Sequence, residues 1–275
     1  MAELYQGCEI ALRLLKCAPP DLQVHVMSME HPNLHLVKPR DGKNSLSTAD
    51  ILRAEISEFR NWRCHHDETF NQHFVKLQVW QVERLKRTHA DLLADARYRA
   101  ATQFFLTEMY GGLDLTELAN EVERALPLAS KLLPDSVLRT SGIALELNSL
   151  TGELDQRMTE ILFEEFKVEE ITPETYCEAY RRTSHQEARY RQLELVSELG
   201  LGLDRYVRSR VIYATFKLAI RPAHMAGLGG LYDFLEKGFA VMRPMGSAAD
   251  FIHRFADVER NISDRIMQSH PDPFA

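Results

Sequence analysis

The stretch Ala101–Asp135, which reads ATQFFLTEMYGGLDLTELANEVERALPLASKLLPD, decides the fold class. An apolar segment ends at two glycines, a second segment with helical spacing follows, and a proline turn leads into a third. Glycine just after a helix and proline at the start of the next are typical stop and start signals, so the stretch predicts successive helices. Phe104 and Phe105 are neighbours and point to different faces of the first helix, which predicts that this helix is buried on two sides.

The same helical spacing recurs along most of the chain after residue 47. One apolar stripe, for example, consists of Phe251, Phe255, Val258, Ile262 and Ile266, as on the buried face of an amphipathic helix. The stripes predict an all-α protein, a multi-helix bundle of about eight or nine helices once some neighbours merge. The expected helices lie near residues 3–17, 48–64, 67–89, 91–110, 115–133, 135–166, 173–199, 203–220, 222–242 and 248–268.

Capping residues predict where several of these helices begin and end. Thr172 followed by Pro173 predicts a helix start, because threonine caps the first turn and proline fits the first helical position. Gly200 and Gly202 predict a break between two helices. Pro222 predicts the start of another helix.

Residues 19–47 are the exception to the helical pattern. Apolar residues alternate there with polar ones, and prolines and an Asp-Gly pair interrupt the segment. The alternation predicts short extended pieces such as one hairpin, and a long loop over the bundle is the alternative. No repeat and no linker rich in Gly, Ser and Pro divides the chain, so we expect a single domain over residues 1–275.

The composition is that of an ordinary soluble globular protein. Of the 275 residues, 45% are hydrophobic and 27% are charged, and the formal net charge is −7. The acidic balance argues against general nucleic-acid binding, and no apolar run is long enough to span a membrane. The four cysteines lack the spacing of zinc or CxxC redox sites, and the first residues do not resemble a secretory signal. We therefore expect a cytoplasmic protein with free thiols.

The segment FFLTEMYG at residues 104–111, followed by Asp114 and by LPLASKLLP at 126–134, is the most distinctive motif of the chain. It resembles the FFL-x-(D/E)-x-YG motif of an uncharacterised bacterial family. The resemblance implies an all-helical fold and no particular activity. At the turn this chain has Gly-Gly-Leu-Asp where the family pattern suggests Gly-Pro-Arg-Asp, so an arginine that could bind an anion there is missing.

Residues 181–192, RRTSHQEARYRQ, have almost no apolar face. One interpretation is a solvated helix stabilised by i,i+4 ion pairs such as Glu178–Arg182. The alternative is an anion-binding wall in which Arg182 and Arg189 meet a carboxylate or phosphate group. Such a wall would suit an acidic protein or a small anionic ligand as partner.

Residues 223–232 combine glycines and alanines four positions apart with one histidine and one tyrosine. Glycine costs about 1 kcal/mol in a helix interior, so these glycines need a packing or functional reason. Close approach of another helix is one such reason. The other is a ligand pocket formed by His224, Gly227, Gly230 and Tyr232.

His66 and His73 are the candidate metal ligands. They are seven residues apart and share a helix face if one helix runs through both. The chain lacks the HExxH and ExxH motifs of helical metal sites, so solvated histidines at a helix junction are the alternative.

These features lead to two hypotheses on function. The first is a binding or protein-interaction module whose surface is the arginine-rich segment, because no catalytic motif stands out. The second is a helical-bundle enzyme or cofactor-binding protein similar to heme oxygenases, in which His224 and the glycines face His66 or His73 across a pocket. The excess of apolar helix faces is compatible with a homodimer.

Overall fold

The structure, a computed structural model, describes residues 53, 56, 68–109, 120–125, 135–183 and 185–275. Within these ranges every regular element is a helix, which confirms the all-α prediction. No helix in the same ranges is both long enough and apolar enough to cross a membrane. The predicted helix at 3–17 and the irregular segment 19–47 lie outside the described residues.

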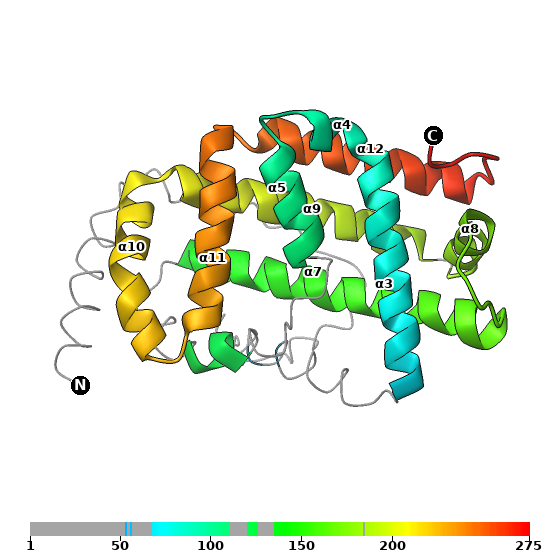
Figure 1. Cartoon of the computed structure of the whole chain (residues 1–275), viewed down its shortest axis with the longest axis horizontal. Coiled ribbons are helices and arrows are strands. Elements are labelled where there is room, and N and C mark those ends of the chain that lie inside the picture. The colour runs from blue at the N-terminus through cyan, green and yellow to red at the C-terminus, as the bar shows by residue number, and fades with distance from the viewer. Residues whose placement is uncertain (1–52, 54–55, 57–67, 110–119, 126–134, 184) are drawn as a thin grey trace, which may run out of the picture.

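Three long helices run side by side along the long axis of the molecule (Figure 1). They are α7 (Asp135–Thr159), α9 (Gln186–Arg208) and α12 (Ala249–Met267), and α9 lies between the other two and packs against both. Three further helices cross this layer, namely α3 (Glu68–Thr88), α5 (Arg99–Phe104) and α11 (Gly229–Met242). The described part of the chain therefore forms two crossed layers of helices.

Shorter elements complete the bundle. α10 (Arg210–Met225) follows α9 and pairs with α11, and α8 (Pro173–Arg182) packs on α12 at the opposite end of the molecule (Figure 1). The start of α8 confirms the capping prediction, because Thr172 accepts a hydrogen bond from the Thr175 N–H and Pro173 lies in the first turn. The remaining elements are α4 (Ala90–Ala94), the π-helical segments Phe105–Met109 and Glu160–Glu165, the 3-10 turn Arg243–Met245 and helical residues 120–125.

Two buried apolar clusters lie along α3 and α12. The first cluster joins α3, α7, the π-helical segment Glu160–Glu165, α8 and α12 and includes Leu77, Met158, Ile161, Tyr176, Ile262 and Ile266. The second cluster joins α3, α4, α5 and α12 and includes Leu85, Leu92, Ala101, Ile252 and Phe255. On α3 the buried residues Gln81 and Arg84 lie between the two clusters. A buried polar layer therefore separates the two apolar clusters.

The helix that carries the FFL motif is buried on two sides, as its adjacent phenylalanines predict. The Phe104 ring packs against Phe234 of α11 with ring centroids 5.6 Å apart. The Phe105 ring meets Phe255 of α12 edge-on at 4.9 Å. The end of the motif, from residue 110 onward, lies outside the described residues.

The predicted break at Gly200 and Gly202 is wrong, because both glycines lie inside α9. Glycine occupies position 200 because α12 approaches α9 closely at this point. A Cβ atom at this position would lie 2.6 Å from Cδ1 of Ile252, which is shorter than a real carbon contact. A packing contact with a distant helix therefore explains this glycine, and the local preference of glycine for helix ends does not apply.

The predicted helix start at Pro222 is also wrong, because this proline lies inside α10. The chain turns at Gly227 instead, whose φ of 74° is a conformation that favours glycine. The predicted helix 173–199 is divided as well, since α8 ends at Arg182 and α9 begins at Gln186.

A matched pair of alanine substitutions tests the close approach of α9 and α12. Gly200→Ala and Gly202→Ala both gain helix propensity, worth about 1 kcal/mol each. Only the first places a methyl group against Ile252, whereas the nearest atom to the second is Oγ1 of Thr140 at 3.4 Å. We expect Gly200→Ala to be less stable than Gly202→Ala by about 1–3 kcal/mol in urea unfolding, the usual cost of overpacking a core. Equal stability of the two variants would contradict this explanation of Gly200.

Candidate functional site

The polar layer between the two apolar clusters is the candidate functional site. Its side chains come from α3, α7, α8, α9 and α12, which are far apart in the sequence. They are Gln81, Arg84, Thr151, Asp155, Tyr176, Tyr180, Arg189, Gln192 and Glu259. Burying a charged group is unfavourable unless a partner compensates it, so each of the four charged groups in this layer requires an explanation.

Glu259 of α12 is the most tightly held group of the layer. Arg84 of α3 donates from Nη1 to both carboxylate oxygens, at 2.6 and 2.5 Å, and Nε2 of His89 lies 2.8 Å from Oε1. Burial alone would raise the pKa of Glu259, but Arg84 and His89 outweigh it and hold the pKa at about 2. Glu259 is therefore ionised, and the buried His89 ring, stacked on Phe255 at 4.4 Å, donates its Nε2–H to it.

Asp155 of α7 is the second buried carboxyl group of the layer. Its environment shifts its pKa in the direction opposite to that of Glu259. Nε2 of Gln81 donates to Oδ1 of Asp155 at 2.9 Å. Burial raises the pKa of Asp155, while the charge of Arg189, the bond from Gln81 and the charge of Arg84 oppose this shift without cancelling it. Within one layer, the pKa of Glu259 is therefore lowered and the pKa of Asp155 is raised.

Arg189 of α9 is buried with one edge of its guanidinium group unsatisfied. The residue is 6% exposed, and its guanidinium lies over the Tyr180 ring, 4.7 Å from the ring centroid. Among the described residues, no acceptor makes a hydrogen bond to Nε or Nη2 of Arg189. These two N–H groups lie on the same edge of the guanidinium plane and point in parallel. This is the edge that binds the two oxygens of a carboxylate or the oxygens of a phosphate.

A cavity of about 50 Å³ adjoins these groups. Polar side chains of the layer line it together with the apolar Leu193, Val196 and Phe255. Gln81 also lines the cavity, and its Oε1 atom accepts no hydrogen bond from any described residue. One water molecule needs roughly 10–15 Å³ of such space, so the cavity has room for a ligand of only a few non-hydrogen atoms.

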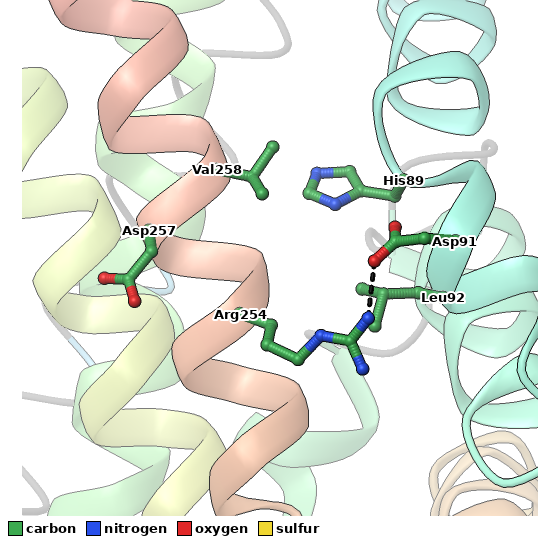
Figure 2. A pocket seen from close by; sticks show the side chains of 6 residues that line it. All are labelled: His89, Asp91, Leu92, Arg254, Asp257 and Val258. Carbon is green, nitrogen blue, oxygen red and sulfur yellow. Dashed lines mark hydrogen bonds and ion pairs between the residues drawn. The ribbon is translucent and has the colours of Figure 1, made fainter.

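A second pocket, of about 210 Å³, lies beside His89 (Figure 2). Figure 2 shows the His89 ring reaching toward α12, with the ion pair of Asp91 and Arg254 on one side and Asp257 turned away. Asp91 and Arg254 are 2.5 Å apart, and both side chains are exposed. The ion pair at this pocket is thus in contact with solvent, whereas the charge of Arg189 is buried.

The structure separates the two arginines that the sequence suggested for one wall. Arg182 lies exposed at the end of α8 and pairs with Glu165 at 3.0 Å, whereas Arg189 is buried on α9. The predicted pair of Glu178 with Arg182 is wrong, since Glu178 pairs with Arg181 at 2.6 Å. The arginine-rich segment is divided between the end of α8 at Arg182 and the start of α9 at Gln186, so Arg182 stays at the surface and Arg189 lies in the core.

The glycine-rich segment forms the turn between α10 and α11. Nη2 of Arg124 donates to the carbonyl oxygen of Gly227 at 2.8 Å. The Glu121 carboxylate accepts the N–H groups of Gly230 and Leu231, at 3.2 and 2.7 Å, and a Cβ on Gly230 would lie 3.0 Å from it. The group that approaches Gly230 in the structure is therefore a carboxylate of the chain itself, which caps the first turn of α11.

His224 and Tyr232, the other candidate ligands of this segment, pack within the α10–α11 pair. Nε2 of His224 lies 3.0 Å from Oδ1 of Asp233, and both side chains are exposed. The Tyr232 ring stacks on Phe216 with centroids 5.3 Å apart.

Of the two candidate metal ligands, the structure describes only His73. Its ring stacks on Phe163 at 4.2 Å. His66 lies outside the described residues. In the part of the chain that the structure describes, no three His, Cys, Asp or Glu side chains gather as metal ligands would.

The comparison with protein families identifies the family of the chain. A family model described as a domain of unknown function, DUF8198, matches residues 61–273. The chain belongs to this family. No curated protein and no solved structure matches the chain. The DUF8198 region includes every residue of the polar layer, so the candidate site lies within the family domain.

Sequence reasoning singled out Arg189 and missed the rest of the polar layer in this DUF8198 protein. The signal that could have revealed these residues is a polar side chain at an apolar position of a helical stripe. Gln81 follows Leu77 at i+4, and Glu259 follows Phe255 at i+4. A single deviation of this kind is common on helix borders, and it becomes informative only when several helices bring such positions together.

Glu259→Gln tests the role of the ionised carboxylate. The difference between the ordinary pKa of 4.5 and about 2 corresponds to roughly 3 kcal/mol of stability. Because folding lowers this pKa, the stabilisation is complete above pH 4.5 and is lost as the pH falls toward 2. We expect the variant to be about 3 kcal/mol less stable than the wild type in urea at pH 7, with a difference that shrinks below pH 4.5.

Asp91→Asn is the matched control for this measurement. Like Glu259, Asp91 is a carboxylate that pairs with an arginine, in this case Arg254. Unlike the pair of Glu259 and Arg84, this pair is exposed. Exposed ion pairs contribute about 0–1 kcal/mol, so the control should lose little stability at any pH. If both variants lost the same amount, the assignment of Glu259 as the group that stabilises the polar layer would be wrong.

Proposed function

We propose that the protein binds a small anionic ligand in the cavity of the polar layer, and that Arg189 holds the negative charge. The observation that carries this proposal is the buried Arg189 guanidinium, whose Nε–H and Nη2–H donate to no described residue. A buried donor without a partner costs about 1–3 kcal/mol. Two oxygens of an anionic ligand on this edge would satisfy both donors at once.

The charges around Arg189 support an anion as the ligand. Glu259 already interacts with Arg84 and His89, which leaves Asp155 as the carboxyl group of the layer that can balance Arg189. Burial raises the pKa of Asp155, so this carboxyl group is a less favourable counter-charge than Glu259. An anionic ligand beside Arg189 would compensate its buried charge more fully.

The cavity also limits the size of the ligand. A volume of about 50 Å³ excludes nucleotides and sugars and admits ions such as formate or nitrate. The two donors of Arg189 are shielded from solvent, so a ligand would reach them after the guanidinium turns toward the cavity over the Tyr180 ring.

The two hypotheses drawn from the sequence remain predictions with weaker support. Recognition of an acidic protein at the surface would use Arg182, which already pairs with Glu165. A heme-oxygenase-like site would use His73 and His224, which contact Phe163 and Asp233 in different parts of the structure. Neither hypothesis rests on a buried group without a partner.

Isothermal titration calorimetry with formate and nitrate, at constant ionic strength, tests anion binding. We expect the wild type to bind at least one of the two ions. Arg189→Lys keeps the charge but removes the two parallel donors, so we expect an affinity at least about tenfold lower. We expect Arg189→Met to abolish binding, and circular dichroism would verify that both variants are folded.

Arg182→Met distinguishes the cavity from the surface. The proposal predicts wild-type affinity for this variant, since Arg182 lies outside the polar layer. Loss of binding in Arg182→Met together with normal binding in Arg189→Met would favour the surface wall. If the folded wild type binds no anion of this size, the proposal is wrong.

A further inference from the structure

We propose that the ligand of the cavity is a small planar oxyanion that carries one O–H group, as the hydrogencarbonate ion does. This inference rests on the proposed function and specifies the ligand of the same site. It depends on a second unsatisfied atom, Oε1 of Gln81, a residue that lines the same cavity as Arg189.

The orientation of the Gln81 amide determines what its oxygen can accept. Nε2 of Gln81 donates to Asp155 at 2.9 Å, which fixes the amide on one side. Oε1 is then directed away from Asp155, and no described residue donates to it. Gln81 is 4% exposed, so its oxygen is a buried acceptor that needs a donor from a ligand.

Together, Arg189 and Gln81 define a complementary ligand. The parallel Nε–H and Nη2–H of Arg189 require two oxygen acceptors that lie in one plane. Oε1 of Gln81 requires one donor. A planar ion with two unprotonated oxygens and one hydroxyl group meets both requirements, and its four non-hydrogen atoms agree with a cavity of about 50 Å³.

Nitrate is the appropriate comparison for this ligand. It has the same planar shape, the same charge and the same number of non-hydrogen atoms as hydrogencarbonate, but it has no O–H group. Nitrate would satisfy Arg189 and leave Oε1 of Gln81 buried without a donor. A site that is built to pair a polar group discriminates against ligands that leave this group unpaired.

Calorimetric titrations of sodium hydrogencarbonate and sodium nitrate, at pH 8 and constant ionic strength in sealed cells, test the inference. We expect the wild type to bind hydrogencarbonate at least about tenfold more tightly than nitrate. Gln81→Met removes the acceptor and keeps the length of the side chain. We expect this variant to bind both ions with similar affinity, because loss of the acceptor weakens the binding of hydrogencarbonate alone.

Gln78→Met is the control, since it makes the same substitution on α3 outside the polar layer. It should keep the wild-type preference. Equal affinity of the wild type for both ions would overturn the inference and leave the proposed function intact. Absence of binding for both ions in the folded wild type would overturn the proposed function as well. Should Gln81→Met fail to fold in a thermal melt, the ratio of the two wild-type affinities still decides the question.

Discussion

The contact of Arg84 with both carboxylate oxygens of Glu259 is the interaction on which the rest of the structure depends. It joins α3 to α12, the two helices that contribute to both apolar clusters. Desolvation of two charges is compensated only when the geometry is close and further bonds complete it, and here His89 supplies the additional bond. Sliding one helix along the other would leave a charge in an apolar environment. Apolar side chains tolerate such shifts far better, so the ion pair fixes the register of α3 against α12.

Arg189 lies in the same layer, but no carboxylate among the described residues accepts a hydrogen bond from its Nε or Nη2. Its guanidinium lies over the face of the Tyr180 ring and is attracted by the Asp155 carboxyl group, while one edge donates to no described residue. Replacement of this side chain by an apolar one of similar volume would remove an unfavourable feature of the core. Positions at which a fold gives up stability in this way are typically functional. The contrast with Arg84, which is buried to a similar degree, is the reason to place ligand binding at Arg189.

Hydrophobic periodicity was sufficient to predict the fold class and part of the packing, as the adjacent rings of Phe104 and Phe105 illustrate. It failed where a distant element decides the local structure. Gly200 continues a helix because Ile252 approaches it from α12, about fifty residues away, and nothing in the neighbouring sequence records this contact. The candidate site shows the same limit. Arg182 and Arg189 belong to one polar run, and only the division of this run between α8 and α9 places the first at the surface and the second in the core.

Burial between two apolar clusters accounts for all the electrostatic properties of the site. A low local dielectric strengthens the attraction between Glu259 and its two partners, which keeps that carboxylate ionised. The same environment raises the pKa of Asp155, because Gln81 and Arg189 stabilise its charge less than burial destabilises it. One edge of the Arg189 guanidinium in the same medium donates to no described residue, and an oxyanion at this edge would be strongly attracted. Since these side chains project from helices and not from loops, the walls of the cavity are formed before a ligand arrives, and binding requires the Arg189 guanidinium to turn but little ordering of the backbone.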